Sequence, residues 1–300
     1  MERVLITGGK GFVGAWVVKH LLGSSLKIRV LDLPRSNDIV ELVLGGAANQ
    51  AEWISGDITN GQVAAEAASE CDAIIHLAAL QLPACRNDPV LGANVNVIGT
   101  LNIFEAAKKN CIPSVTYMST ASVFGPDDGT IPNAATHYGT FKLANEGSAR
   151  SYWHDAGIAS VGLRPFVLYG PGRDAGLSAG ISLACRAAAL GEPYTITFVG
   201  RADFVYVEDL AKALIAATFL PPQGARVFSL PGEVASVEEI IEEIRAIAPG
   251  ANITSNGSTN PTISELSGLD LRLAIPGIPR TSLRDGLRST IDQYFYNKII

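Results

Sequence analysis

The sequence predicts an α/β protein built around a doubly wound parallel sheet, followed by a smaller lobe. In the first half of the 300-residue chain, short apolar runs typical of buried strands alternate with longer stretches of helical periodicity. Such βαβ alternation indicates a parallel sheet with helices on both faces. The first apolar run leads into a turn with three regularly spaced glycines, and the alternation loosens after residue 165. We therefore expect a sheet domain over residues 1–165 and a second lobe over residues 166–300.

The first strand, expected at residues 3–7, enters a helix at residues 11–23 through a turn that contains Gly8, Gly11 and Gly14. In a dinucleotide-binding turn, the first glycine permits a sharp bend, the second admits a phosphate, and the third lets the helix pack against the strand. Free N–H groups at the start of the helix favour an anion. A strand, these glycines and a helix in this order predict a fold of the Rossmann type.

The second strand, expected at residues 26–32, ends in Asp32. Its distance from Gly14 is close to the spacing of about 20 residues at which an acidic side chain binds the adenosine ribose. A carboxylate here accepts hydrogen bonds from both ribose hydroxyls and repels a 2′-phosphate, which favours NAD over NADP. Two alternatives stand beside this interpretation: Asp32 opens the turn at Leu33, or Arg35 swings toward a 2′-phosphate.

The remaining elements follow the same alternation up to residue 165. The other strands of this part are expected at 52–55, 73–77, 114–119 and 160–165, and its other helices at 37–45, 60–69, 90–110 and 138–157. Beyond it, helices are expected near 180–190, 208–220, 236–248 and 282–296, among short strands near 194–198, 203–207 and 226–230. We expect some of these later segments to return to the main sheet and the rest to form a substrate-binding lobe.

Helix 138–157 opens with Tyr138 and carries Lys142 one turn later, on the same face. An ammonium close to a phenol stabilises the phenolate and lowers its pKa from the usual value of about 10. Upstream stand the hydroxyls of Ser119, Thr120 and Ser122. Together these groups suit proton transfer to or from an alcohol or a carbonyl. The spacing alone also fits an exposed aromatic ring beside a solvated lysine.

Composition excludes several classes of partner. The net charge of −6 and the pI near 5.3 disfavour a nucleic-acid surface. No uninterrupted apolar run reaches the roughly 20 residues that a membrane helix needs, and a strand expected from residue 3 leaves no room for a signal peptide. Four scattered cysteines lack the paired spacing of a metal site. We therefore expect a reduced, cytoplasmic protein with no metal, no membrane and no nucleic acid.

Helices 90–110 and 138–157 are apolar on more than one face. One face of each must cover the sheet, and the other is available to a second copy of the chain. This pattern favours a homodimer, and deeper burial within one subunit is the alternative.

Several motifs follow one another in a fixed order along the chain. They are TGGKGFVG at 7–14, Asp57-Ile58, HLAA at 76–79, NVIGT at 96–100, STASVFG at 119–125, Tyr138 with Lys142, Arg164-Pro165 followed by YGPG at 169–172, and DFVYVED at 203–209. Together they resemble the motifs of the extended short-chain dehydrogenase/reductase family, in its NAD-dependent epimerase/dehydratase group. This resemblance implies a Rossmann fold, NAD as the cofactor and a homodimer.

The resemblance also implies roles for individual residues. Thr120 is expected to hydrogen-bond the reacting oxygen, Tyr138 to act as acid and base, and Lys142 to hold the nicotinamide ribose and lower the Tyr138 pKa. The implied cofactor-binding residues are Gly8, Gly11, Phe12, Val13, Gly14, Asp32, Leu33, Asp57, Ile58, Leu77, Ala78, Ala79, Asn96, Tyr138, Lys142, Pro165 and Phe166.

Substrate contacts are expected from Gln81, Thr120, Ser122 and Arg173. Arg173 lies in the loop that should border the substrate, where a guanidinium can bind a carboxylate or a phosphate. A solvated loop arginine is the alternative. Gln81 follows the turn at 77–79 and is expected to reach the substrate or to face solvent.

The sequence departs from its relatives at the expected substrate edge. Ala121 follows Thr120 where the dehydratases of the group have an acid pair, so elimination of water is not expected. Val167 occupies the place of an asparagine that touches the substrate diphosphate in nucleotide-sugar members. Ala202 precedes the DFVYVED run where those members carry arginine, and Arg201 is shifted by one residue. These departures favour a free sugar, a sugar acid or another small hydroxy compound.

The leading hypothesis is an NAD-dependent oxidoreductase that acts on a hydroxyl of a sugar, sugar acid or related polar alcohol. The alternative is a nucleotide-sugar epimerase that oxidises its substrate transiently with tightly bound NAD. A non-catalytic NAD-binding regulator is disfavoured, because such relatives tend to lose the Tyr-Lys pair. Reduction of a hydrophobic ketone is disfavoured by the polar loop at 170–180.

Overall fold

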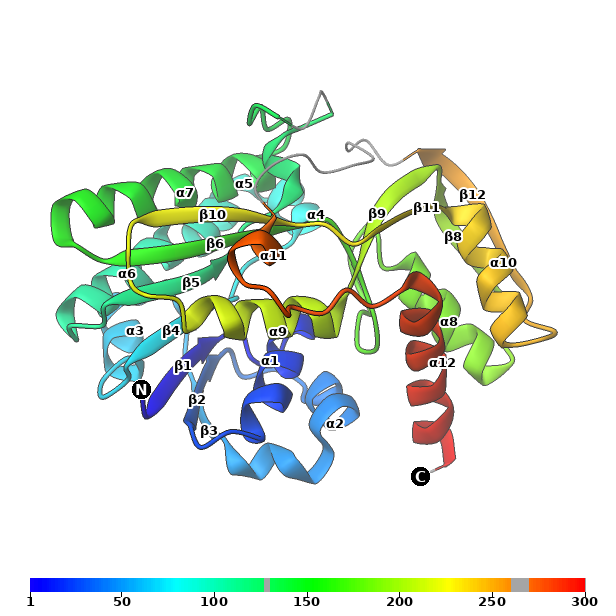
Figure 1. The fold of residues 1–300 in the computed structure, drawn as a ribbon, viewed down its shortest axis with the longest axis horizontal. Helices are drawn as coiled ribbons and strands as arrows, with labels where there is room; N and C mark the ends of the chain where they lie inside the picture. Colours follow the sequence, from blue (N-terminus) through cyan, green and yellow to red (C-terminus); the bar gives the residue numbers. More distant parts are fainter. Residues whose placement is uncertain (127–129, 260–269, 300) are drawn as a thin grey trace.

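The computed structural model describes residues 1–126, 130–259 and 270–299 (Figure 1). Within them, a seven-stranded sheet has the order β10-β6-β5-β4-β1-β2-β3, and every neighbouring pair is parallel. Its strands are β1 (Arg3–Thr7), β2 (Lys27–Asp32), β3 (Glu52–Ser55), β4 (Ala73–His76), β5 (Ser114–Met118), β6 (Ala159–Pro165) and β10 (Ala225–Leu230). The predicted doubly wound parallel sheet is confirmed.

Helices cover both faces of this sheet (Figure 1). On one face lie α1 (Phe12–Leu22), α2 (Asp38–Leu44) and α9 (Val207–Thr218), and on the other α3 (Gly61–Ala67), α6 (Gly99–Lys109) and α7 (His137–Ala156). Along β1, Val4 and Ile6 belong to the apolar cluster on the α1 face, whereas Leu5 belongs to the cluster on the α6 face. Alternate side chains of one strand thus serve the two faces.

The helix expected at 90–110 is interrupted by a turn of π-helix. It consists of α5 (Pro89–Ala93), the π turn η2 (Asn94–Ile98) and α6. By length and composition alone, the stretch Pro89–Lys109 is apolar enough to cross a membrane, with 44% of its most apolar window buried. A core helix of a parallel α/β sheet has the same composition, and here α6 packs against α3, α7 and the sheet.

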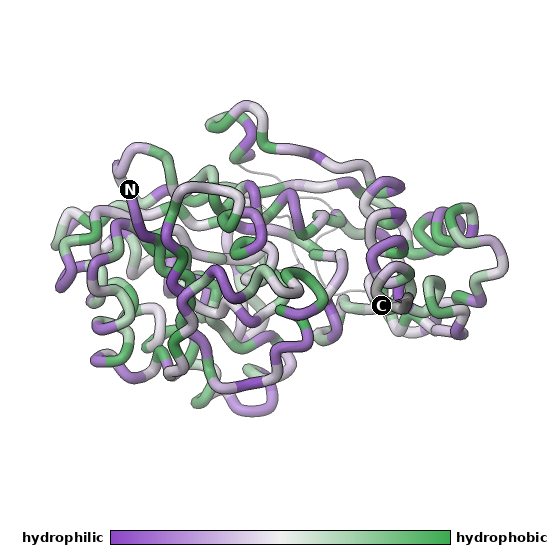
Figure 2. Tube along the Cα trace, turned by 90° about the horizontal axis from the view of Figure 1, so that it is seen from below, coloured by the Kyte–Doolittle hydropathy of each residue, from purple (hydrophilic) through white to green (hydrophobic). Residues whose placement is uncertain are grey.

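Residues after 165 contribute to two places. Helix α9, strand β10 and the short helix α11 (Leu271–Ala274), which packs on β10, belong to the layers of the main sheet, while the other elements form a smaller assembly at one end of the molecule (Figures 1 and 2). That assembly holds a sheet of β11 (Glu233–Ser236), β9 (Arg201–Tyr206) and β7 (Val167–Tyr169), and the pair β8 (Tyr194–Val199) and β12 (Ile253–Thr259). Its helices include α8 (Gly180–Leu190), α10 (Val237–Ile247) and α12 (Leu283–Ile299).

Several short elements were not expected from the sequence. They are α4 (Leu82–Asn87), α11 (Leu271–Ala274), β7, β11, β12, and the 3-10 turns η1 (Gly45–Gln50) and η3 (Ala121–Val123). Strand β7 is only three residues long and exists through its pairing with β9. Such elements are specified by tertiary contacts, because their length leaves no periodic pattern to detect.

Candidate active site and cofactor pocket

A cavity of about 510 Å³ lies along the carboxyl ends of the central strands. This is where open α/β sheets bind ligands. Every residue predicted for catalysis or binding lines it, except Asn96. These lining residues are Gly8, Gly11, Phe12, Val13, Gly14, Asp32, Leu33, Asp57, Ile58, Leu77, Ala78, Ala79, Gln81, Thr120, Ser122, Tyr138, Lys142, Pro165, Phe166 and Arg173.

The glycine turn brings two backbone segments into close approach. Gly8 has a φ of +75°, and a Cβ atom added to it would lie 2.6 Å from the backbone nitrogen of Ala78. A Cβ on Gly14 would collide with the carbonyl oxygen of Gly8. Helix α1 starts after Gly11 with no side-chain cap and no acidic residue in its first turn. The start of the helix therefore has no side-chain acceptor and no acidic side chain in its first turn, which fits the diphosphate of a dinucleotide.

Asp32 lies at the end of β2 and is 8% exposed. Its carboxylate accepts hydrogen bonds from the backbone nitrogens of Lys10 and Leu33, both at 2.8 Å, and from Nη2 of Arg35 at 2.9 Å. These bonds fix the carboxylate at the cavity wall, where the ribose was predicted to bind. Arg35 also lines the cavity, and its contact with Asp32 holds it in an ion pair.

A buried network supports the turn after β4. Oγ1 of Thr7 accepts from the backbone nitrogens of Leu77 and Ala78, at 3.2 and 3.3 Å. Its hydroxyl lies 2.7 Å from Nδ1 of His76. Burial lowers the pKa of His76 to about 3, with a smaller contribution from the Lys142 charge, so the ring is neutral. Since Thr7 already accepts two bonds, it donates to Nδ1, and the ring proton is assigned to Nε2.

The network continues from His76 into η2. Nε2 of His76 lies 3.0 Å from Oγ1 of Thr100, which in turn donates to the carbonyl oxygen of Asn96 at 2.7 Å. The Asn96 side chain bonds both the nitrogen and the oxygen of Leu80, at 2.7 and 2.9 Å. Asn96 thus lies beneath the cavity wall and holds the loop that forms it. Sequence reasoning missed Asn145, whose Nδ2 donates to the Asn96 carbonyl at 2.8 Å.

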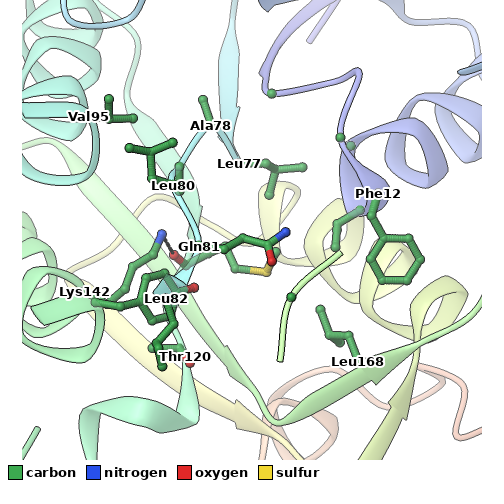
Figure 3. Close-up of a pocket in the computed structure, with 18 of the residues that line it drawn as sticks. Phe12, Leu77, Ala78, Leu80, Gln81, Leu82, Val95, Thr120, Lys142 and Leu168 are labelled. Atoms are coloured by element: carbon green, nitrogen blue, oxygen red, sulfur yellow. Dashed lines mark hydrogen bonds between the residues drawn. The ribbon is translucent and has the colours of Figure 1, made fainter. Parts of the chain in front are cut away.

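Lys142 and Thr120 lie close together at the other end of the cavity (Figure 3). Tyr138 lines the same end and contacts both of them. Nζ of Lys142 donates to the carbonyl oxygen of Met118 at 2.8 Å and lies 5.9 Å from the centre of the Tyr138 ring. Burial lowers the pKa of Lys142 to about 8. Burial also raises the pKa of Tyr138 to about 12, and the strongest opposing influence is the charge of Arg173. The expected lowering of the Tyr138 pKa by Lys142 stays a prediction.

The neighbouring hydroxyls of Ser119 and Thr120 have different hydrogen-bond partners. Oγ of Ser119 donates to the buried carboxylate of Glu146 at 2.6 Å. Arg164 donates two further bonds to Glu146, at 2.8 and 2.5 Å, so this trio joins α7 to β6. Thr120 instead accepts from the backbone nitrogen of Ser122 at 3.1 Å, and its hydroxyl hydrogen-bonds the phenol of Tyr138. Thr120, not Ser119, therefore lies beside the phenol that was predicted to act as acid and base.

Arg173 reaches the cavity from the segment after β7. Its Nη2 donates to Oγ of Ser178 at 3.0 Å, and its guanidinium carbon lies 5.7 Å from the centre of the Phe12 ring. Gly176 has a φ of +102°, and a Cβ added there would lie 2.5 Å from Oε1 of Gln81. Gln81 projects into the space between Lys142 and Phe12 (Figure 3). Gln81 and Arg173, two of the four residues predicted to contact the substrate, therefore lie close together.

Part of the cavity wall was not foreseen from the sequence. It includes the apolar side chains of Leu80, Leu82, Leu91, Val95 and Leu177. The sequence places Leu91 and Val95 only on a helix that covers the sheet. The π turn at Asn94–Ile98 interrupts the regular periodicity of this helix. No pattern in the sequence predicts a π turn.

Relatives of this chain are found among enzymes that act on nucleotide sugars. A UDP-glucose 4-epimerase of Mycolicibacterium smegmatis is 27% identical over 315 residues, which cover 99% of both chains. A putative UDP-glucose 4-epimerase of Methanocaldococcus jannaschii is 28% identical over 81% of both chains. The UDP-glucose 4-epimerase of Thermus thermophilus, solved with NAD, is 26% identical with a TM-score of 0.80, and the match covers 97% of this chain and 98% of that one.

The family is established by a match over most of the chain. Residues 4–226 match the model of the NAD dependent epimerase/dehydratase family. The match includes the glycine turn, Asp32, the Thr120-Tyr138-Lys142 group and the segment with Arg173. The chain therefore belongs to the NAD-dependent epimerase/dehydratase family and is an NAD-dependent enzyme of the extended short-chain dehydrogenase/reductase type.

Proposed function

We propose that this protein oxidises a ring hydroxyl of a sugar, with Tyr138 as the acid and base that transfers the proton. One observation carries the proposal. Tyr138, Lys142 and Thr120 meet at one end of a cavity whose other end, formed by the glycine turn and Asp32, fits a dinucleotide. NAD bound there supplies the acceptor for the hydride that leaves the sugar carbon. A substrate hydroxyl that reaches Tyr138 lies in the same cavity.

The protein residues have separate tasks in this chemistry. Thr120 donates its hydroxyl proton to the reacting oxygen and orients it. The Tyr138 phenol is neutral at physiological pH, because its pKa is about 12, and it can donate a proton to a carbonyl oxygen. Removing a proton from an alcohol requires a lower pKa, which the neighbouring cations favour. The Met118 carbonyl holds the Lys142 ammonium in place.

The relatives favour epimerisation as the overall outcome. Two UDP-glucose 4-epimerases match this chain over 97% or more of its length. In an epimerase, the oxidised sugar turns over in the site and takes the hydride back on its other face, so the cofactor is regenerated. Net oxidation is the second candidate. It is favoured by Val167, an apolar residue on the cavity wall where nucleotide-sugar members are expected to have asparagine.

One experiment separates the two outcomes. Purified protein and NAD are mixed with UDP-glucose, UDP-galactose and a panel of free sugars and sugar acids. Absorbance of reduced nicotinamide and NMR of the sugar are followed together. Inversion of a sugar carbon without NADH accumulation establishes an epimerase, and stoichiometric NADH establishes a dehydrogenase. If neither occurs with any sugar while NAD still binds, the proposal is wrong.

We also propose a homodimer and a cytoplasmic location. The dimer is supported by the outer face of α5 and η2, where Val90 and Ile98 are 72% and 44% exposed. Large apolar side chains gathered on one helix face favour an interface with another chain. Residues 166–300, apart from α9, β10 and α11, are proposed to form the lobe that holds the substrate, since the cavity continues onto the segment 165–178.

A further inference from the structure

The charged groups of the cavity are divided between its two ends. Among the described residues that line it, the only carboxylates are Asp32, the last residue of β2, and Asp57, which follows β3. Arg35, which also lines this end, is paired with Asp32. At the opposite end, beyond β4, the lining charges are the cations Lys142 and Arg173. The end next to Tyr138 is therefore electropositive in a protein whose net charge is −6.

Arg173 is held by a backbone that is fixed on both sides. Nε1 of Trp16 donates to the carbonyl oxygen of Pro171 at 3.0 Å, and the backbone nitrogen of Gly172 donates to the hydroxyl of Tyr294 at 2.8 Å. These bonds tie the base of the segment to α1 and to α12. The guanidinium rests above Phe12 and against Ser178. A ligand that meets it finds a preorganised cation, which lowers the entropic cost of binding.

One of the donors of this guanidinium, Nε, has no hydrogen-bond partner among the residues that the structure describes. Nε of Arg173 is also shielded from solvent. A buried, unsatisfied donor of a charged group is costly. Burial accordingly lowers the pKa of Arg173 to about 10, although the charges of Tyr138 and Asp174 act in the opposite direction. An anion placed at Nε would satisfy the donor and offset the charge.

Gln81 and Arg173 approach the same point of the cavity wall, at Gly176. A Cβ on Gly176 would fall 2.5 Å from Oε1 of Gln81 and 3.4 Å from Nη2 of Arg173. The amide and the guanidinium therefore end close to each other, and both line the cavity. An amide can turn its N–H₂ group toward an anion, so the two side chains can bind the two oxygens of one carboxylate.

We propose that Arg173 and Gln81 bind a carboxylate carried by the sugar ring itself, so that the substrate is a sugar acid. This inference rests on the proposed function. Arg173 and Tyr138 line the same cavity, and the Arg173 charge opposes the rise of the Tyr138 pKa. An anionic group on the sugar ring that reacts at Tyr138 would therefore lie within reach of Arg173.

The test measures binding without turnover. Protein loaded with NAD and carrying Tyr138→Phe is titrated calorimetrically with D-glucuronate and D-glucose, and with UDP-glucuronate and UDP-glucose. We expect the acid of at least one pair to bind about tenfold or more tightly than its neutral counterpart, as a charge-assisted hydrogen bond predicts. The pair that shows the preference tells whether the acid is free or linked to a nucleotide. Equal affinities, or no binding of any acid, would overturn the proposal.

Variants then assign the preference to Arg173. In the same background, Arg173→Gln should abolish the preference for the acid, and Arg173→Lys should keep part of it. Arg284→Gln, which removes an exposed arginine outside the cavity, should keep it fully. NAD affinity is measured in parallel. If Arg173→Gln weakens NAD by as much as it weakens the acid, the guanidinium serves the cofactor and the proposal is overturned. Epimerisation or oxidation confined to neutral sugars would sink this inference and leave the proposed function standing.

Discussion

In the proposed mechanism, one side chain, Tyr138, transfers the proton. Tyr138→Phe removes the proton donor and leaves the ring in place, so we expect turnover to fall by about 10²–10⁴-fold. NAD affinity should stay nearly unchanged, because the phenol acts on the substrate. Steady-state kinetics and calorimetric titration with NAD measure the two quantities. Tyr296→Phe, at a tyrosine 65% exposed on α12, is the matched control. Full activity in Tyr138→Phe would refute the mechanism.

Removal of the Ser119 hydroxyl should reduce stability, whereas removal of the adjacent Thr120 hydroxyl should reduce turnover. Ser119→Ala breaks a 2.6 Å bond to a buried carboxylate, and the loss of a bond to a charged group costs about 1.5–3 kcal/mol of unfolding free energy. Its turnover per folded molecule should change little. Thr120→Ala should lose turnover and little stability. Urea unfolding and kinetics on both variants check this. A larger loss of turnover in Ser119→Ala would show that the two roles are exchanged.

Long, periodic elements were predictable because each sequence segment contains its own signal. Strands β1 and β2 are apolar runs buried on both faces, and α1 follows a glycine turn that the sequence displays openly. The segments that form strand β7 and helix α4 contain no such signal of their own. Their residues adopt regular structure through contacts with distant segments, which one sequence cannot display.

The same distinction applies to the site. Tyr138 and Lys142 share one helix, and Gly8 to Gly14 share one turn, so spacing alone relates them. Glu146 also lies on α7, yet its partner Arg164 comes from β6 and only the fold joins them. Ser178 meets Arg173 through a loop whose path the sequence does not define. The cofactor end of the cavity was therefore predictable, and much of the substrate end was not.

The network beneath the cavity ties β1, β4 and η2 together through a neutral histidine, and this makes stability depend on pH. His76 has a folded pKa of about 3, below the unfolded value of 6.5. The unfolded chain thus binds one more proton between these values. Stability from this residue is fully present above pH 6.5 and falls by about 1.4 kcal/mol per unit as pH drops toward 3.

NMR of the His76 ring checks this prediction directly. Its chemical shift should not titrate between pH 8 and pH 5 in the folded protein, because its pKa is about 3. Urea unfolding across the same range should show a steeper loss of stability in the wild type than in His76→Asn. His154→Asn should match the wild type. Titration of His76 near pH 6 in the folded state would contradict the assigned network.

Considered as a whole, the molecule places one cavity across two structural parts. The sheet supplies the glycine turn, Asp32 and the Tyr138 helix, while the segment after β7 supplies Arg173. Trp16 of α1 holds that segment through Pro171. Because the contact joins the cofactor end to the substrate end, the geometry of one depends on the other.

The proposed homodimer can be tested with charged substitutions at its expected interface. If α5 and η2 form the interface, charges at Val90 and Ile98 should separate the subunits, because a desolvated carboxylate has no partner there. We expect Val90→Asp combined with Ile98→Asp to be monomeric by light scattering, while the wild type is dimeric. Leu273→Asp, at an apolar residue 76% exposed on α11, should stay dimeric. A monomeric wild type, or dissociation caused by Leu273→Asp alone, would place the interface elsewhere or exclude it.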